Sequence, residues 1–525
     1  MTAGRPALPA VALALALVGS ACPGGCGSAG RPNVLLVVID TARADRFSFD
    51  GYARQTSPEI ATLASEGTIY EQAYTPAPWT LPAHASLFTG LFPSSHGADS
   101  GHLRLEGEFR TLAEIFHDAG YRTLGYAANP WVGRQYGLDQ GFDTYEEIWK
   151  DVRGQQEDAG AGELNARLVR FLEWRAENRV AREQPFFIFV NYLEPHLPYN
   201  PPEPARSRFL SPGTDRAAVE RLRHFRHPDE VRYVLGLGGL KAGDTRILSD
   251  LYDGEISYVD ERVGDLAGFL RRRGLLDETV LVITSDHGEA IGDHGFLDHK
   301  MNVFDELLRI PLVVRFPAAV QAGQRIREPV MLQDLFPTLL GLAGIPPEGG
   351  RARGPEPRES LVLPGIGALA RDAVRAAPGS GSPGPVLASE FARPIQFLEI
   401  IQERFPTARI GPWDRALVAY RRGSEKLHWA SDGRHLLFDL ASDPGETVDL
   451  AAKHPDRVAA LAAEVESWLK RPSARPPLRL PPAELAPPLS ERRAAPDPAR
   501  AHEPHPAAPC LSPDPPALTL RETGC

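Results

Sequence analysis

The sequence predicts an α/β fold whose central sheet is mainly parallel and flanked by helices, followed by a smaller C-terminal α+β subdomain. Three short apolar runs carry this prediction, at residues 33–40, 185–196 and 279–288. They do not alternate with polar residues, which is typical of strands buried on both faces of a parallel sheet. Helical patterns separate the runs, and alternation of buried strands with amphipathic helices indicates an α/β domain.

Two helices between these runs have clear boundaries in the sequence. Thr111 can cap the helical pattern "LAEIFHDAG", which Gly120 ends. A longer helix is expected from about Arg246 to Arg273, with Gly274 after it. Its apolar face is formed by Leu251, Val259, Val263, Leu266 and Leu270.

Composition divides the 525-residue chain into five segments. Residues 1–27 have one Arg, an apolar run and then small residues, which predicts an export signal. Residues 28–347 form the predicted α/β catalytic domain, and 348–384 a linker rich in Gly, Pro and Arg. Residues 385–470 form the C-terminal α+β subdomain, and 471–525 a Pro- and Ala-rich tail predicted to be disordered.

The N-terminal segment also bears on localisation. "GSAC" ends at Cys22 and resembles a bacterial lipobox, which would make Cys22 the lipidated first residue of the mature protein. A plain secretory signal is the alternative. The apolar run is shorter than the roughly 20 residues of a membrane-spanning helix. We therefore expect an exported protein, periplasmic or held to a membrane through a lipid at Cys22.

Charge and cysteine placement exclude several function classes. The net charge is −11 and no basic stripe is present, which argues against a nucleic-acid partner. The four cysteines lie at positions 22, 26, 510 and 525. The predicted catalytic domain therefore has no disulfide framework, cysteine metal site or thiol nucleophile. Oligomeric state is left open.

Polar residues follow each of the three predicted strands. Asp40 ends the first, Glu194 and His196 the second, and Asp286 and His287 the third. In open α/β sheets the ligand binds outside the carboxyl ends of the strands, so these side chains predict a site at one edge. Oxygen and imidazole donors suit Zn or Mn, and Ca less well.

The segment "EAIGDHGFLDHK" follows the third strand and places several ionisable residues in one loop. They are Asp293, His294, Asp298, His299 and Lys300. A functional loop beside the strand end and a hydrophilic surface loop are both consistent with this composition.

The stretch "APWTLPAHASLFTG" supplies a hydroxyl at a predicted helix start. Thr80 is followed by Leu81 and Pro82, which predicts Thr80 as the N-cap and a proline in the first turn. A helix N-terminus is also an anion site, because its free N–H groups attract phosphate or sulfate. Thr80 can therefore be a cap, a reactive group, or both.

These segments resemble the sulfatase family of the alkaline phosphatase superfamily, from about Asn33 to Leu450. The family signature has Cys or Ser, any residue, Pro, any residue and Arg, followed by Leu, any residue, Thr and Gly. Pro82, Leu87, Thr89 and Gly90 match it here, whereas Thr80 stands at the Cys or Ser position and His84 at the Arg position. Further blocks in family order are "NVLLVVIDTARAD", "YLEPHLPY", "SDHGEAIGDHG", "VFDELLRIPLVVRFP" and "LFDLASDPGETVDL".

The resemblance implies an alkaline phosphatase-like fold with one divalent metal ion, Mn, Zn or Ca. It implies that the metal ligands are Asp40, Thr80, Asp286 and His287. It implies contacts with the ester or its leaving group for His196, His299 and Lys300. Asn129, in "YAANPW", would contact the anion, or it is a turn residue before proline. His84 would hydrogen-bond the Thr80 oxygen or accept its proton, or it is a packed and inert histidine.

Formylglycine, which the family makes from the Cys or Ser of its signature, is not expected at Thr80. A threonine ester cannot collapse to an aldehyde, so water or another acceptor must cleave it. The sequence thus predicts a metal-dependent hydrolase of sulfate or phosphate/phosphonate esters, small-molecule or glycan/lipid in nature, with Thr80 as nucleophile. The alternatives are a phosphotransferase of the phosphoethanolamine or glycerol-phosphate type and a non-catalytic binder of sulfated or phosphorylated glycans.

Overall fold

The computed structural model describes residues 30–152, 158–346, 362–366 and 387–470. The predicted export signal with Cys22, all but five residues of the predicted linker and the predicted tail lie outside this range. None of the described helices combines the length and apolar character needed to cross a membrane.

An eight-stranded sheet runs through the centre, in the order β12-β2-β11-β7-β1-β6-β4-β5. The three strands predicted from the sequence are its middle: β1 (Asn33–Ile39), β6 (Phe186–Tyr192) and β7 (Thr279–Thr284). β1 pairs in parallel with both β6 and β7, so the carboxyl ends of all three lie at one edge. The other strands are β2 (Thr68–Tyr70), β4 (Arg122–Ala127), β5 (Thr144–Glu147), β11 (Leu312–Arg315) and β12 (Gln324–Ile326). Of these, only β11 pairs antiparallel, with β7 and β2, and the predicted mainly parallel sheet is confirmed.

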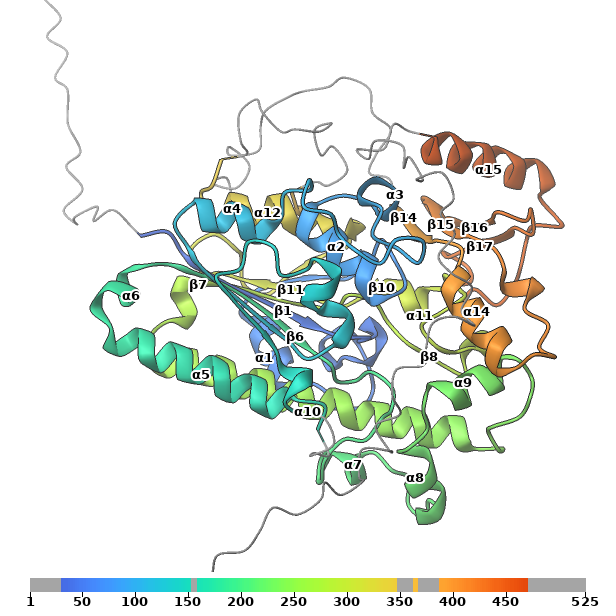
Figure 1. Ribbon diagram of the computed structural model, residues 1–525, viewed down its shortest axis with the longest axis horizontal. Helices are drawn as coiled ribbons and strands as arrows, with labels where there is room; N and C mark the ends of the chain where they lie inside the picture. The colour runs from blue at the N-terminus through green and yellow to red at the C-terminus, as the bar shows by residue number, and fades with distance from the viewer. Residues whose placement is uncertain (1–29, 153–157, 347–361, 367–386, 471–525) are drawn as a thin grey trace, which may run out of the picture. The chain divides into compact units, whose positions relative to one another are not determined.

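Both faces of the sheet are covered, which explains why its strands lack polar alternation. Val34, Leu36 and Val38 point into one apolar core, and Leu35, Val37 and Ile39 into the other. Helices α2 (Thr80–Thr89), α4 (Leu112–Asp118) and α12 (Leu335–Leu342) cover the first face. Helices α1 (Pro58–Ser65), α5 (Ala161–Glu177) and α10 (Asp244–Arg272) cover the second (Figure 1).

The two helices predicted from the sequence, after Thr111 and before Gly274, are present as α4 and α10. Thr111 caps α4 by accepting a hydrogen bond from the Glu114 N–H, and the Glu114 side chain accepts one from the Thr111 N–H. Helix α10 spans 29 residues, and its five predicted apolar positions are all buried.

A four-stranded antiparallel sheet forms the C-terminal part, in the order β14 (Leu387–Phe391), β15 (Leu417–Arg422), β16 (Glu425–Ala430) and β17 (Leu436–Asp439). With α14 (Ile395–Arg404) and α15 (Pro455–Leu469) it makes the smaller α+β part that the sequence predicts. β14 also bonds to the chain ahead of α2: the Ser389 hydroxyl donates to the Thr75 carbonyl and the Glu390 N–H to the Pro76 carbonyl.

Short elements connect these layers. The helices are α3 (Pro93–His96), α6 (Arg179–Glu183), α7 (Ala205–Arg208), α8 (Arg216–Leu222), α9 (His227–Val234) and α11 (Asp305–Leu308). The strands are β3 (Ala73–Tyr74), β8 (Ala290–Ile291), β9 (Leu297–Asp298), β10 (Arg309–Ile310) and β13 (Val330–Met331).

Candidate active site

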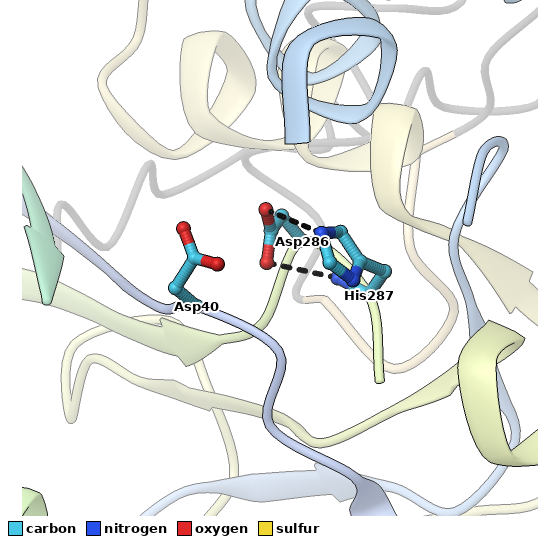
Figure 2. A group of neighbouring side chains, drawn as sticks. All are labelled: Asp40, Asp286 and His287. Carbon is cyan, nitrogen blue, oxygen red and sulfur yellow. Dashed lines mark hydrogen bonds and ion pairs between the residues drawn. The ribbon is translucent and has the colours of Figure 1, made fainter. Parts of the chain in front are cut away.

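The carboxyl edge of the sheet gathers the predicted metal ligands. Asp40 follows β1, Asp286 and His287 follow β7, and Thr80 begins α2. All four are at most 1% exposed. Figure 2 shows the Asp286 carboxylate between that of Asp40 and the His287 ring.

The spacing of these atoms fits a divalent cation. His287 Nε2 lies 3.3 Å from Asp286 Oδ2 and 3.3 Å from Thr80 Oγ1. Tetrahedral ligands about 2.0–2.2 Å from a zinc ion lie roughly 3.3–3.6 Å from one another. Asp40 Oδ1 and Asp286 Oδ2 are buried and have no hydrogen-bond partner among the described residues. One ligand atom each of Asp40, Asp286 and His287 lies within 4.8 Å of the others, and a cation among them would satisfy such unpartnered acceptors.

The electrostatics of the cluster favour a bound cation as well. Burial, and then the nearby negative charge of Asp286, raise the pKa of Asp40 to about 7. Burial raises the pKa of Asp286 to about 7, against hydrogen bonds from the Thr41 and His287 N–H groups. Both carboxylates are thus costly to keep charged, and a divalent ion between them would offset that cost.

His287 is oriented to act as a ligand through Nε2. Its Nδ1 lies 2.9 Å from the Gly288 carbonyl oxygen, so Nδ1 carries the proton and Nε2 keeps its lone pair. Burial lowers the pKa of His287, which favours this neutral form.

Thr80 is not the cap of its helix. It is the first residue of α2, Trp79 is the N-cap, and no side chain caps this end. The predicted capping bond is absent because the hydroxyl faces the site: Oγ1 contacts His287 Nε2, and Asn129 Nδ2 donates to it at 3.5 Å.

Asn129 joins the site through its side chain. Its Nδ2 donates to Asp40 Oδ2 at 2.7 Å, and its Oδ1 accepts from the Trp131 N–H at 2.8 Å. The residue is therefore a turn residue before proline whose side chain also contacts Asp40 and Thr80, and its contact with the anion stays a prediction.

Asn191 is a site residue that sequence reasoning missed. Its Nδ2 donates to Asp40 Oδ2 at 3.1 Å, and its Oδ1 accepts from the Asn129 N–H. It lies inside the apolar run of β6, whereas the site residues predicted from the three strands all stand at the ends of their runs. A single amide within a strand buried on both faces was the available signal.

His84 contacts Thr80 through the backbone and not through the hydroxyl. Its Nδ1 donates to the Thr80 carbonyl oxygen at 2.9 Å and lies 3.5 Å from Asp286 Oδ2. Burial lowers its pKa to about 3, and its ring packs edge-on against Phe88 and Phe189. His84 thus holds the start of α2 beside the metal-ligand cluster.

His196 and His299 complete the edge of the site. The His299 ring centroid lies 4.4 Å from that of His287 and 5.0 Å from that of His196. Lys300 turns aside: its Nζ donates to Asp298 Oδ2 at 2.6 Å and lies over the Phe397 ring. The structure therefore brings both histidines to the cluster and pairs Lys300 with a carboxylate behind them.

The polar loop after β7 divides between two roles. Asp298 and His299 are buried, at 2% and 4% exposed, so the surface-loop alternative does not describe them. Asp293 instead pairs with Arg43, and the His294 ring stacks on Phe304. Glu194 also points away from the cluster, since it accepts hydrogen bonds from the backbone at residues 159 and 161.

Comparison with known proteins agrees with this arrangement. The family model described as "Sulfatase" matches residues 32–345, more than half of the chain. The choline-sulfatase of Rhizobium meliloti (strain 1021) is 27% identical over 467 residues, covering 80% of this chain and 83% of that protein. The uncharacterized sulfatase YidJ of Escherichia coli (strain K12) is 26% identical over 346 residues, covering 60% and 68%.

Solved structures share the fold. The phosphonate monoester hydrolase of Agrobacterium radiobacter superposes with a TM-score of 0.63 at 23% identity, covering 83% of this chain and 95% of that one. A 2-O GAG sulfatase superposes with a TM-score of 0.60 at 19% identity, covering 84% and 92%. The alkaline phosphatase-like architecture is thereby confirmed. The chain belongs to the sulfatase family of ester hydrolases.

Proposed function

We propose that this protein is a metal-dependent hydrolase of sulfate or phosphate/phosphonate esters that uses Thr80 as its nucleophile. One observation carries the proposal: the buried Thr80 hydroxyl lies 3.3 Å from His287 Nε2, one of the predicted metal ligands. A merely structural threonine at a helix start would cap the helix, and this one does not.

Asp40, Asp286 and His287, with the Thr80 oxygen, would hold one divalent ion, Mn, Zn or Ca. When bound, such an ion supplies Lewis-acid chemistry, lowering the pKa of a hydroxyl and neutralising charge on a transferring group. The donor set of two carboxylates and one imidazole favours Zn or Mn over Ca.

The chain's own residues account for the other roles. Thr80 Oγ1 gives up its proton and forms a bond to phosphorus or sulfur while the bond from that atom to the leaving oxygen breaks. The proton that Thr80 gives up would pass to the leaving oxygen by way of His196 and His299, whose neutral rings stand at the edge of the cluster. Asn129 Nδ2 lies between Asp40 and Thr80 and would steady the attacking oxygen and the anion. Water then attacks the transferred atom, the bond from that atom to Thr80 Oγ1 breaks, and one proton of the water returns to Oγ1.

The substrate class follows the relatives only in outline. The solved relatives include a phosphonate monoester hydrolase, a 2-O GAG sulfatase and a structure with D-glucosamine-2-N,6-O-disulfate as substrate. We propose a small-molecule or glycan/lipid ester for this chain. Because a threonine ester must be opened by attack at the transferred atom, a phosphoryl or phosphonyl group suits it best.

A panel of esters tests the proposal. The chain without residues 1–27, loaded with Mn or Zn, is assayed on an aryl sulfate, phosphate mono- and diesters and a phosphonate monoester. We expect turnover of at least one ester, and its loss in Thr80→Ala. Thr89→Ala is the matched control, because Thr89 is a buried threonine at the other end of α2 whose hydroxyl donates to the Ala85 carbonyl. Turnover that survives Thr80→Ala contradicts the nucleophile, and failure of every ester with metal bound favours a phosphotransferase or a glycan binder.

Export is a separate proposal from the first 27 residues. We infer that the protein is periplasmic or anchored through a lipid at Cys22. Mass spectrometry of the mature N-terminus checks it: a diacylglyceryl-modified Cys22 is expected, and an unmodified N-terminus after another cleavage site would indicate a plain secretory signal.

A further inference from the structure

A second cluster of potential ligands lies next to the first. Glu289, Asp298 and His299 are 0%, 2% and 4% exposed, and one ligand atom of each lies within 4.8 Å of the others. His299 Nδ1 is 2.7 Å from Asp298 Oδ1 and 3.5 Å from Glu289 Oε1. The second distance lies in the roughly 3.3–3.6 Å range of neighbouring ligands of one zinc ion, and the first is shorter, so those two atoms would move apart when an ion binds.

The Glu289 carboxylate carries the strongest sign of a missing partner. Both of its oxygens are buried and have no hydrogen-bond partner among the described residues. Asp40 and Asp286 at the first cluster each leave one such oxygen. A buried carboxylate with two unpartnered oxygens is costly unless an ion, water or proton satisfies it.

The basic side chains of Lys300 and His227 pair with Asp298 and not with Glu289. Lys300 Nζ and His227 Nδ1 both contact Asp298 Oδ2, at 2.6 and 3.1 Å. His227 Nδ1 also contacts Glu230 Oε2, at 2.9 Å. Among the ion pairs of the described residues, Glu289 appears only with His299. Asp298 Oδ1 also accepts a hydrogen bond from the His299 N–H at 2.6 Å. Of the three carboxylates, Glu289 is therefore the one that neither Lys300 nor His227 contacts.

We propose that Glu289, Asp298 and His299 bind a second divalent cation, Zn or Mn. The site uses His299 Nδ1, Asp298 Oδ1 and a Glu289 oxygen, none of which belongs to the first cluster. The centroids of the His287 and His299 rings are 4.4 Å apart, so the residues that would hold the two ions are neighbours. An ion on Nδ1 fixes the His299 ring with Nε2 turned to the rest of the site. The inference goes beyond the proposed function, because it requires no turnover.

Metal stoichiometry tests it. The full chain and its variants are stripped with chelator, loaded separately with Zn²⁺ or Mn²⁺, dialysed, and analysed for metal per chain by plasma mass spectrometry. We expect two ions in the wild type, one in Glu289→Gln, one in Asp286→Asn and none in the double variant. Glu194→Gln is the matched control and keeps two, because Glu194 is also a buried glutamate with an unpartnered oxygen but lies outside both clusters.

Either of two stoichiometries overturns the proposal: one ion in the wild type that Asp286→Asn removes, or wild-type metal content in Glu289→Gln. Anomalous diffraction from zinc-loaded wild-type crystals gives a readout that needs no variant to fold. A peak within bonding distance of Glu289 and His299 is expected, and a peak at Asp40 and Asp286 alone overturns the second site. Absence of metal at Asp286 would count instead against the metal-dependent mechanism, so the two failures are distinguishable.

Discussion

The Thr80 hydroxyl lies 3.3 Å from His287 Nε2, although 207 positions separate the two residues. The parallel pairing of β7 with β1 sets the position of His287. The packing of α2 on the sheet sets that of Thr80. Neither side chain would be near the other without both layers, so the reactive geometry is a product of the whole fold.

Thr80→Ser should retain activity within about tenfold, because serine keeps the hydroxyl at the same backbone position. Thr80→Val keeps the shape without the hydroxyl and should lower kcat by about a thousandfold or more. Steady-state kinetics on the preferred ester, with metal content of each variant as control, checks this. Comparable rates for valine and serine would show that the hydroxyl does not form the covalent bond.

Asn129→Ala should lower kcat/KM by about 10- to 100-fold, because it removes a hydrogen bond to the Asp40 carboxylate worth roughly 1.5–3 kcal/mol. Asn165→Ala is the comparison, since Asn165 donates to the Arg262 carbonyl away from the site. Kinetics of both variants at saturating metal decide it. An unchanged rate in Asn129→Ala would show that Asn129 serves only as a turn residue and does not contribute to catalysis.

Gly288→Ala should destabilise the protein by about 1–3 kcal/mol and weaken metal binding. A Cβ at position 288 would lie 2.0 Å from the Glu306 carbonyl oxygen, so the segment carrying His287 must shift. Gly411→Ala is the control, because a Cβ there meets nothing within 4 Å. Thermal denaturation with and without metal measures both. Equal Tm values for the two variants would mean that the backbone accommodates the methyl group.

Glu446→Gln should cost about 1–3 kcal/mol at pH 7, because the buried Lys426 then keeps only Asp305 as a carboxylate partner and the buried His428 loses its carboxylate contact. Burial alone would raise the pKa of Glu446, but the charges of Lys426 and His428 outweigh it and lower that pKa to about 2. A lowered folded-state pKa adds stability that is present above the unfolded-state value of 4.5 and is lost as pH falls toward 2.

The Tm advantage of the wild type over Glu446→Gln should therefore be constant from pH 7 to about 5 and shrink toward pH 3. Glu464→Gln, which breaks a more exposed pair with Arg422, should cost less than about 1 kcal/mol across the same range. A wild-type advantage that grows on acidification would contradict the assigned direction of the shift.

Much of this fold follows from local signals in the sequence. The strands β1, β6 and β7 are apolar on both faces, and α4 carries its own capping box, so each is legible without its neighbours. The directions of individual side chains are not local. Thr80 has a cap's sequence context but turns its hydroxyl to His287, and Glu194 follows its strand yet turns to the backbone at residues 159–161.

The candidate site could likewise be predicted where its residues follow strands, and not where tertiary contacts place them. Asp40, Asp286 and His287 follow buried strands, and parallel pairing alone brings them to one edge. Asn191 lies within a strand, and the partners of Glu289 and Lys300 depend on how the loop after β7 folds back on itself. Such contacts depend on tertiary packing, for which the sequence pattern has no periodic signal.

The hydrogen bonds from β14 to the segment just ahead of α2 mean that the C-terminal sheet and the catalytic part depend on each other. Ser389 and Glu390 satisfy backbone carbonyls at Thr75 and Pro76, and the Glu390 side chain holds Ser94 beyond the helix. One apolar cluster is shared by Tyr74, Phe92 and the C-terminal strands. A chain cut at the break in composition near residue 347 would lose these contacts and expose that cluster. The C-terminal sheet is therefore not an exchangeable module, and we expect it to unfold together with the catalytic part in a single cooperative transition.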